Sequence, residues 1–297
     1  MFKDLSLFKL PYSKEDIQEN HIEGLLYGQF GEVPYKQVWK EQWLSNDYYL
    51  KEIDLMGEIL SANDLHSRPI LVKGSALLFT IYKDLGSRFM SDCDILIDPR
   101  DLRTIKELFL SNGYKQVKCS TWFANEFKVQ LSKDINGFEI NIELHTKLLY
   151  HQDYDTWNTI ELNKYYDTLD TQDHVIYMCA HLAFAHSFLK LYWLFDIFLT
   201  LEENKSINYD VLKSRAKDLK VHNSLRMCFW VLGNFFDSRF SVGVRSFLYS
   251  KILNETTLWK VKQTGISYFL IKHLSKDSLF LSFKYDFLWA LNKLFGR

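Results

Sequence analysis

Proline and cysteine are scarce in this chain of 297 residues, with four of each. So few prolines argue against long flexible connections, and no internal repeat or low-complexity linker interrupts the sequence. The cysteines are dispersed and form no Cys-x-x-Cys pair, so we expect reduced and mostly buried thiols rather than a disulfide framework. They are Cys93, Cys119, Cys179 and Cys228.

The sequence also lacks an excess of either charge, a long apolar run and an export signal. A formal net charge of −1 gives no global field that would draw the chain to nucleic acid. The most apolar stretch, residues 175–201, is interrupted by Lys190 and Asp196, and its uninterrupted runs are shorter than the ~18 residues of a membrane span. Residues 1–4 lack the features of a signal peptide. We therefore expect a soluble, cytoplasmic protein with no transmembrane segment.

Apolar and aromatic residues are plentiful, at 47% and 16% of the chain, which supports a packed core and argues against disorder. Charge is distributed unevenly: from Lys251 to the end there are eight Lys and Arg residues and three Asp and Glu residues. A basic, aromatic tail of this kind suits weak contact with a membrane surface or another phosphate-rich partner. An ordinary helix with solvated lysines is the more common explanation.

Helix and strand patterns divide the chain into three regions: an N-terminal helical region (1–66), a central core (67–165) and a C-terminal helical domain (166–297). In the first region, apolar residues recur at helical spacing at Tyr49, Ile53, Met56 and Leu60. In the central region helices and strands alternate, which predicts a small α/β or α+β sheet.

Two local signals place elements within the central region. Asp101 is positioned to cap a helix over residues 102–111. Asn136-Gly137 lies between the strand-like runs 127–131 and 138–145 and therefore predicts a β-hairpin.

Two aspartates, Asp92 and Asp94, lie in a run that continues with residues 95–97 and predicts a strand. Successive strand side chains point to opposite faces, so these two carboxylates project side by side from one face. Acids held this close raise each other's pKa unless a cation lies between them. Oxygen ligands of this kind suit Mg²⁺ or Mn²⁺.

Upstream of the acids, Gly74 and Ser75 precede a helical run over residues 76–82. A glycine lets the backbone approach a ligand closely, and the free N–H groups at a helix start favour phosphate. A phosphate cradle followed by an acid pair is what metal-assisted phosphoryl or nucleotidyl transfer needs. Each piece alone is equally explained by a turn or a solvated strand edge, and it is their combination that indicates a site.

Gly74-Ser75 followed by Asp92-x-Asp94 resembles the signature of the polymerase-β-like nucleotidyltransferase superfamily, whose usual spacing is somewhat shorter. The longer string from Lys73 through Arg88 and Asp94 to Asn112-Gly113-Tyr114 is similar to a bacterial branch of uncharacterised nucleotidyltransferases, over about residues 68–200. The resemblance implies an α+β fold. Its polymerase-β-like nucleotidyltransferase core, a small mixed sheet with flanking helices, would lie between the N-terminal and C-terminal helical regions.

The resemblance also implies a third acid on a neighbouring strand. Along residues 138–145, apolar side chains alternate with a polar face that carries Glu143 and His145. Glu143 is expected as the third ligand, with Glu139 as the alternative and a general-base role also open to Glu143. His145 is expected to orient a carboxylate or contact substrate, although a lone histidine is more often a packed neighbour. The predicted catalytic and metal-binding residues are thus Asp92, Asp94 and Glu143.

Further polar residues complete the predicted site. Arg88 is expected to clamp the triphosphate, or alternatively to pair with Asp84 along a helix. In the helical half, three polar residues that interrupt an apolar helix would contact substrate or form an internal polar network; they are His186, Lys190 and Asp196. The predicted nucleotide-binding residues are Lys73, Gly74, Ser75 and Arg88.

The reaction that the resemblance implies is attack by an acceptor on the α-phosphate of a nucleoside triphosphate (NTP), with Mg²⁺ or Mn²⁺ as cofactor. Such a reaction transfers a nucleoside monophosphate (NMP). We expect the acceptor to be a small molecule, a saccharide or a peptide, in surface-polysaccharide or natural-product biosynthesis. The alternatives are a toxin-like transferase that modifies tRNA, a kinase-like phosphotransferase, and a non-catalytic binding module with the same fold.

Overall fold

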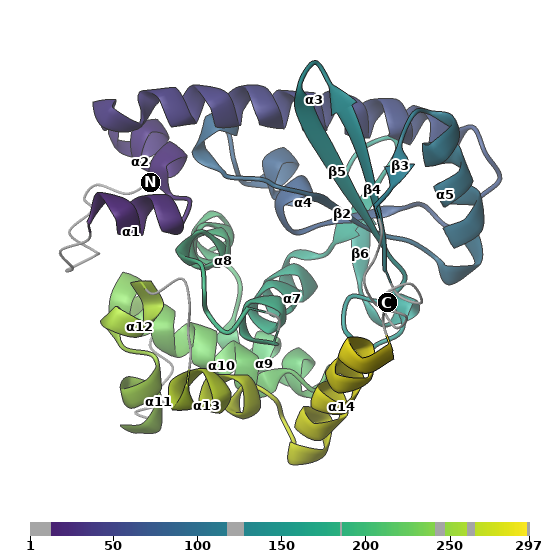
Figure 1. Cartoon of the computed structure of the whole chain (residues 1–297). Helices are drawn as coiled ribbons and strands as arrows, with labels where there is room; N and C mark the ends of the chain where they lie inside the picture. The colour runs from purple at the N-terminus through teal and green to yellow at the C-terminus, as the bar shows by residue number, and fades with distance from the viewer. Residues whose placement is uncertain (1–12, 118–127, 185, 241–246, 260–264, 296–297) are drawn as a thin grey trace. The chain divides into compact units, whose positions relative to one another are not determined.

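The computed structural model describes residues 13–117, 128–184, 186–240, 247–259 and 265–295 (Figure 1). The chain forms two compact units, each built from separated segments. The helical unit comprises residues 1–39 and 171–283, and the sheet unit comprises residues 40–170 and 284–297. The chain is mixed α and β, as the sequence predicts, whereas the division into three regions stays a prediction.

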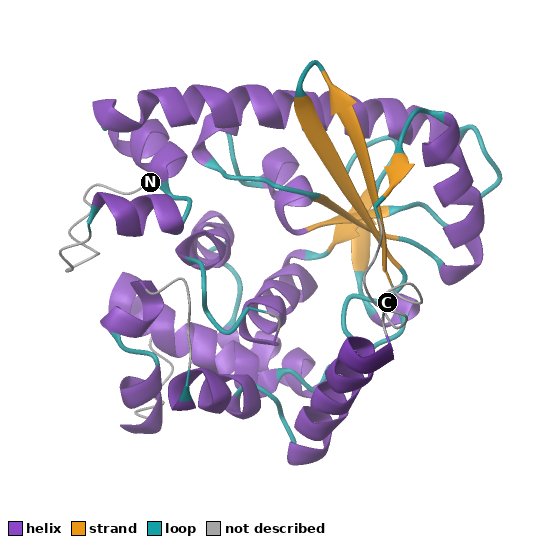
Figure 2. Ribbon diagram, in the orientation of Figure 1, coloured by secondary structure: helices purple, strands orange, loops and turns teal. Residues whose placement is uncertain are grey.

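One mixed sheet of seven strands organises the sheet unit (Figure 2). Its strands are β1 (Ile70–Val72), β2 (Cys93–Leu96), β3 (Lys115–Gln116), β4 (Lys128–Ile135), β5 (Phe138–His145), β6 (Thr159–Glu161) and β7 (Asp167–Leu169). Their order across the sheet is β3-β4-β5-β2-β1-β7-β6. The central strand β2 runs parallel to β5 and antiparallel to β1.

The β4–β5 hairpin confirms its sequence signal. Asn136 and Gly137 form the turn with φ of 55° and 85°, both in the left-handed region that a two-residue hairpin turn of this type requires. Along β5 the buried side chains of Ile140, Ile142 and Leu144 face the core. A two-residue turn sets the register of the whole hairpin, so each β4 residue has a determined partner on β5.

Helix α3 (Lys36–Ser61) brings the predicted apolar stripe into the core: Tyr49, Ile53, Met56 and Leu60 are each 1% exposed. The Tyr49 hydroxyl donates to the Ser91 carbonyl at 2.8 Å and accepts from the Asn141 N–H at 3.1 Å. The helix is therefore bonded both to the residue before Asp92 and to β5.

Two shorter helices complete the described part of the sheet unit before β3: α4 (Lys73–Thr80) and α5 (Leu102–Ser111). The predicted bounds of α5 are confirmed, but the expected cap is wrong. The Asp101 side chain makes no capping bond. It accepts instead from the backbone N–H of His66 at 3.0 Å and pairs with His66 Nδ1 at 2.7 Å, so a tertiary contact replaces the local one.

The described helices of the helical unit are α1 (Lys14–Glu19), α2 (Glu23–Phe30), α7 (Thr171–Phe184), α8 (Leu191–Glu203), α9 (Tyr209–Asp218), α10 (His222–Val231), α11 (Phe247–Ile252), α12 (Glu255–Trp259) and α13 (Ile266–Leu274). Within this unit, the fully buried Asp173 of α7 accepts two bonds from Arg215 of α9, at 2.8 and 2.6 Å. A last helix, α14 (Leu279–Phe295), has residues in both units. Among the helices that the structure describes, none combines the length and the apolar character needed to cross a membrane.

Packing around Gly57 generates a stability prediction. A Cβ atom at this α3 position would lie 2.7 Å from Tyr166 Cε2 and 2.8 Å from Tyr165 Cβ. Tyr166 is fully buried and donates to the Ile53 carbonyl at 2.9 Å. We expect Gly57→Ala to lower the free energy of unfolding by about 1–3 kcal/mol. This loss should appear even though alanine favours a helix over glycine by ~1 kcal/mol. Urea denaturation measures the change.

The exposed neighbour Glu58 provides the control. Glu58→Ala should change stability by less than about 0.5 kcal/mol. A Gly57→Ala variant as stable as the wild type would contradict the described packing of α3.

Candidate active site

Parallel pairing of β2 with β5 places Asp94 directly beside Glu143. Both residues are buried, at 3% and 8% exposure. Asp92 lies just before β2 and is only partly buried, so the expectation that both aspartates belong to the strand is wrong for Asp92. Its pKa nevertheless responds to the charges of Asp94 and Glu143, which indicates that the three predicted acids lie in one neighbourhood.

His145 connects the two buried acids. Its Nε2 atom lies 2.8 Å from Asp94 Oδ1 and 3.5 Å from Glu143 Oε2. One potential ligand atom from each of Asp94, Glu143 and His145 falls within 4.8 Å of the others. A role for His145 in orienting the two carboxylates stays a prediction.

Two lysines supply the counter-charges. Lys73 Nζ lies 2.7 Å from the same Asp94 Oδ1 that contacts His145. Lys128 on β4 forms an ion pair with Glu143 Oε2, and the Gln130 side chain donates to Glu143 Oε1 at 2.7 Å.

Sequence reasoning missed Lys128 and Gln130, although a signal was present. In a hairpin whose two turn residues are Asn136 and Gly137, Gln130 must lie opposite Glu143, and the structure shows this pairing.

The electrostatics follow from these contacts. Burial alone would raise the pKa of Asp94, but Lys73 and His145 hold it well below its usual range. Burial likewise opposes ionisation of Glu143, and the bond from His145 with the charge of Lys128 lowers its pKa to about 2. Burial and the Asp94 charge instead raise the pKa of Asp92.

His145 carries its proton on the nitrogen that faces the acids. Burial lowers its pKa, yet the bonds to Asp94 and Glu143 outweigh burial and raise it. Because an ionised carboxylate can only accept, Nε2 must be the donor in the hydrogen bond to Asp94.

The Gly-Ser segment forms the first turn of α4, directly after β1. The Ser75 hydroxyl is fully buried and donates to the carbonyls of Val72 at 2.7 Å and Asp94 at 3.2 Å. Its bonds thus fasten the start of α4 to β1 and β2.

The guanidinium of Arg88 lies against this turn. A Cβ on Gly74 would be 2.2 Å from Arg88 Nη1, so only glycine leaves room for the arginine in this position. Arg88 is 5% exposed, and Nη1 donates to the Phe89 carbonyl at 2.8 Å.

The alternative prediction placed Asp84 and Arg88 on one helix. This placement is wrong, because α4 ends at Thr80. The Asp84 carboxylate accepts from Gly86 N at 3.1 Å and Ser87 Oγ at 2.5 Å.

The remaining predicted residues belong to the helical unit and make contacts within it. Lys190 donates to the Glu19 carbonyl. The His186 ring lies 3.9 Å from the Trp193 ring, at an interplanar angle of 30°. Asp196 is buried in α8, at 3% exposure. A substrate role for these residues stays a prediction.

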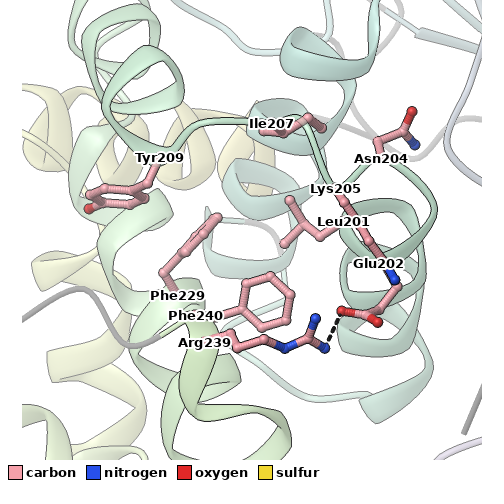
Figure 3. Close-up of a pocket in the computed structure, with 9 residues that line it drawn as sticks. All are labelled: Leu201, Glu202, Asn204, Lys205, Ile207, Tyr209, Phe229, Arg239 and Phe240. Carbon is pink, nitrogen blue, oxygen red and sulfur yellow. Dashed lines mark hydrogen bonds and ion pairs between the residues drawn. The ribbon is translucent and has the colours of Figure 1, made fainter.

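The helical unit also contains a pocket with a volume of about 280 Å³. Figure 3 shows the rings of Phe229 and Phe240 in this pocket, with Tyr209 at one side and Arg239 beside Glu202. Arg239 Nη2 lies 2.7 Å from Glu202 Oε1. None of the predicted site residues lines this pocket.

Comparison with protein families gives a match over most of the chain. A protein-family model described as "Uncharacterised nucleotidyltransferase" matches residues 35–237, a range that includes the acids, the Gly-Ser turn and Arg88. No curated protein matches the chain. The match is to the family that the sequence motifs resemble.

The contact between Gly74 and Arg88 can be tested by a double-mutant cycle. Gly74→Ala should lower the free energy of unfolding by about 1–3 kcal/mol, because the added methyl group must displace a buried guanidinium. In an Arg88→Ala background the same substitution should cost less, since the clashing atoms are gone. Chemical denaturation of the four proteins gives the coupling energy. Strictly additive losses would contradict this packing.

Proposed function

Since the chain belongs to the uncharacterised nucleotidyltransferase family, we propose that it transfers NMP from an NTP to a hydroxyl of a small-molecule, saccharide or peptide acceptor. The observation that carries the proposal is the group formed by Asp94, Glu143 and His145. It lies on adjacent strands, and Lys73 of the first turn of α4 contacts it. A role in surface-polysaccharide or natural-product biosynthesis is part of the same proposal.

The residues fit a divalent cation. Carboxylate oxygens are the ligands that Mg²⁺ and Mn²⁺ prefer. Burial raises the pKa of Asp92, and the negative charges of Asp94 and Glu143 add to this shift. We propose that Asp92, Asp94 and Glu143 hold the metal, with His145 bonded to two of them. When bound, the metal would polarise the phosphoryl oxygens and neutralise charge on the leaving pyrophosphate.

The chain's own groups would position the nucleotide. The N–H groups of the first turn of α4 suit the triphosphate, and Lys73 and Arg88 supply cations beside this turn. Ser75 would act through the turn, because its hydroxyl is bonded to two carbonyls. The depressed pKa of Glu143 suits a permanently charged ligand better than a general base.

Transfer of the γ-phosphoryl group would use the same residues, and product analysis separates the two reactions: NMP transfer releases pyrophosphate, whereas kinase activity releases a nucleoside diphosphate. Acceptor screening with labelled NTP tests two further possibilities. Label that appears on tRNA would identify a tRNA acceptor, and label that appears on no acceptor would favour a non-catalytic binding module.

Helix α14 supports contact with a membrane surface as a further part of the proposal. Five apolar side chains lie within roughly one third of the helix circumference and are 63% to 79% exposed; they are Leu279, Phe280, Phe283, Phe287 and Leu294. Lys284 is exposed beside them, and no Asp or Glu is exposed in the described part of this helix. An apolar stripe flanked by a cation suits an anionic lipid surface.

Substitution of Asp92 tests the catalytic proposal. Asp94→Asn would also remove the ion pair with Lys73. Asp92 is less buried, and within the described part of the chain its carboxylate has a single long side-chain contact, with Ser91 Oγ at 3.3 Å. Asp92→Asn should therefore leave stability nearly unchanged and reduce turnover more than about 100-fold, since loss of an outer-shell partner already costs 10- to 100-fold. Pyrophosphate release measures turnover. Full activity in this variant would refute the metal-site assignment.

Substitution of α14 tests the membrane proposal. Phe283→Ser/Phe287→Ser should reduce co-sedimentation with phosphatidylglycerol vesicles at least tenfold, because each buried Phe contributes ~1.5–3 kcal/mol. Ile160→Ser removes an equally apolar and 50% exposed side chain from β6 and should change nothing. Equal sedimentation of the wild type and the double variant would contradict the proposal.

A further inference from the structure

Both buried acids of the site are already neutralised by the chain itself. Asp94 has Lys73 and His145 as partners, and Glu143 has Lys128. The two pairs on Asp94 meet at one atom: Lys73 Nζ is 2.7 Å from Oδ1 and His145 Nε2 is 2.8 Å from it.

The backbone at Lys73 is unusual in the same place. Lys73 has a φ of 52°, in the left-handed region that non-glycine residues rarely adopt. It is also the first residue of α4 and follows β1, which is paired with β2. Strained backbone of this kind persists where surrounding contacts hold it, and the ion pair with Asp94 is such a contact.

A metal ion and this ammonium group compete for the same carboxylate. Two hydrogen bonds already occupy Asp94 Oδ1, so a cation at this atom would have to displace one of the two donors. Asp94 is 3% exposed and the Lys73 side chain 13% exposed, so little water is present to screen the repulsion between a divalent cation and the ammonium.

We infer that Lys73 is the counter-ion of the metal-free site, and that it and a divalent cation exclude each other at Asp94. The inference rests on the proposed function and concerns the order of binding. Without nucleotide, Lys73 keeps the metal out. The triphosphate offers Lys73 a new anionic partner next to the first turn of α4, so metal and nucleotide bind together. Because coupling between two ligands is reciprocal, each must strengthen the binding of the other.

Calorimetric titration with Mn²⁺ alone tests this competition. Lys73→Met keeps the length of the side chain and removes its charge, so bare Mn²⁺ should bind at least tenfold more tightly than it binds the wild type. Lys73→Gly should show the same gain, and glycine tolerates the left-handed backbone at this position, so this second variant guards against misfolding. In both variants, the strengthening of Mn²⁺ binding by a non-hydrolysable NTP analogue should be smaller than in the wild type.

Lys147→Met is the matched control. Lys147 lies two residues after His145 and pairs with Asp153 at 2.6 Å, so this variant loses the same charge in the same unit without a contact to Asp94. Its affinity for Mn²⁺ should change less than threefold. An equal gain in this control, or no gain in either Lys73 variant, would overturn the inference.

The same titrations separate this inference from the proposed function. Binding of Mn²⁺ with the NTP analogue in the wild type, without any gain for bare Mn²⁺ in the Lys73 variants, would overturn the competition and leave the nucleotidyltransferase site standing. No binding of Mn²⁺ to any of the proteins, with or without analogues of the four nucleotides, would overturn both.

Discussion

The parallel pairing of β2 with β5 is the constraint on which the candidate site depends. It sets Asp94 beside Glu143 and brings His145 within hydrogen-bonding distance of Asp94. The neighbours of these strands then supply the opposite charge: β1 leads into Lys73, and β4 carries Lys128. The acids and their positively charged partners thus lie on adjacent strands or directly after one, so no long loop is needed to position these side chains.

Much of this arrangement could be predicted because it follows from the alternation of side chains along a strand and from the pairing register of the hairpin. The alternation of β5 separates Ile142 from Glu143, and the Asn136-Gly137 turn sets which β4 residues lie opposite. The motifs around Gly74 and Asp92 also predicted the family, which the family model confirms. These signals are local, or depend on one short connection.

What could not be predicted depends on contacts between residues far apart in the chain. Asp101 has the sequence position of a helix cap, but its carboxylate is bonded to His66 instead. Lys73 combines a left-handed backbone with an ion pair to Asp94, 21 residues away in the chain, and local propensity describes neither feature. The close approach of Arg88 to Gly74 likewise exists only after the sheet has formed.

Helix α3 contacts the site directly, although the sequence prediction placed it in an N-terminal helical region outside the core. One hydroxyl, that of Tyr49, joins it both to Ser91, which precedes the first acid, and to Asn141, two residues before the third. The family match begins at residue 35, one residue before this helix. The matched range thus includes the helix, the strands and the acids, and a shortened protein that starts at β1 would contain every predicted catalytic residue while lacking the bonds from Tyr49 to Ser91 and Asn141.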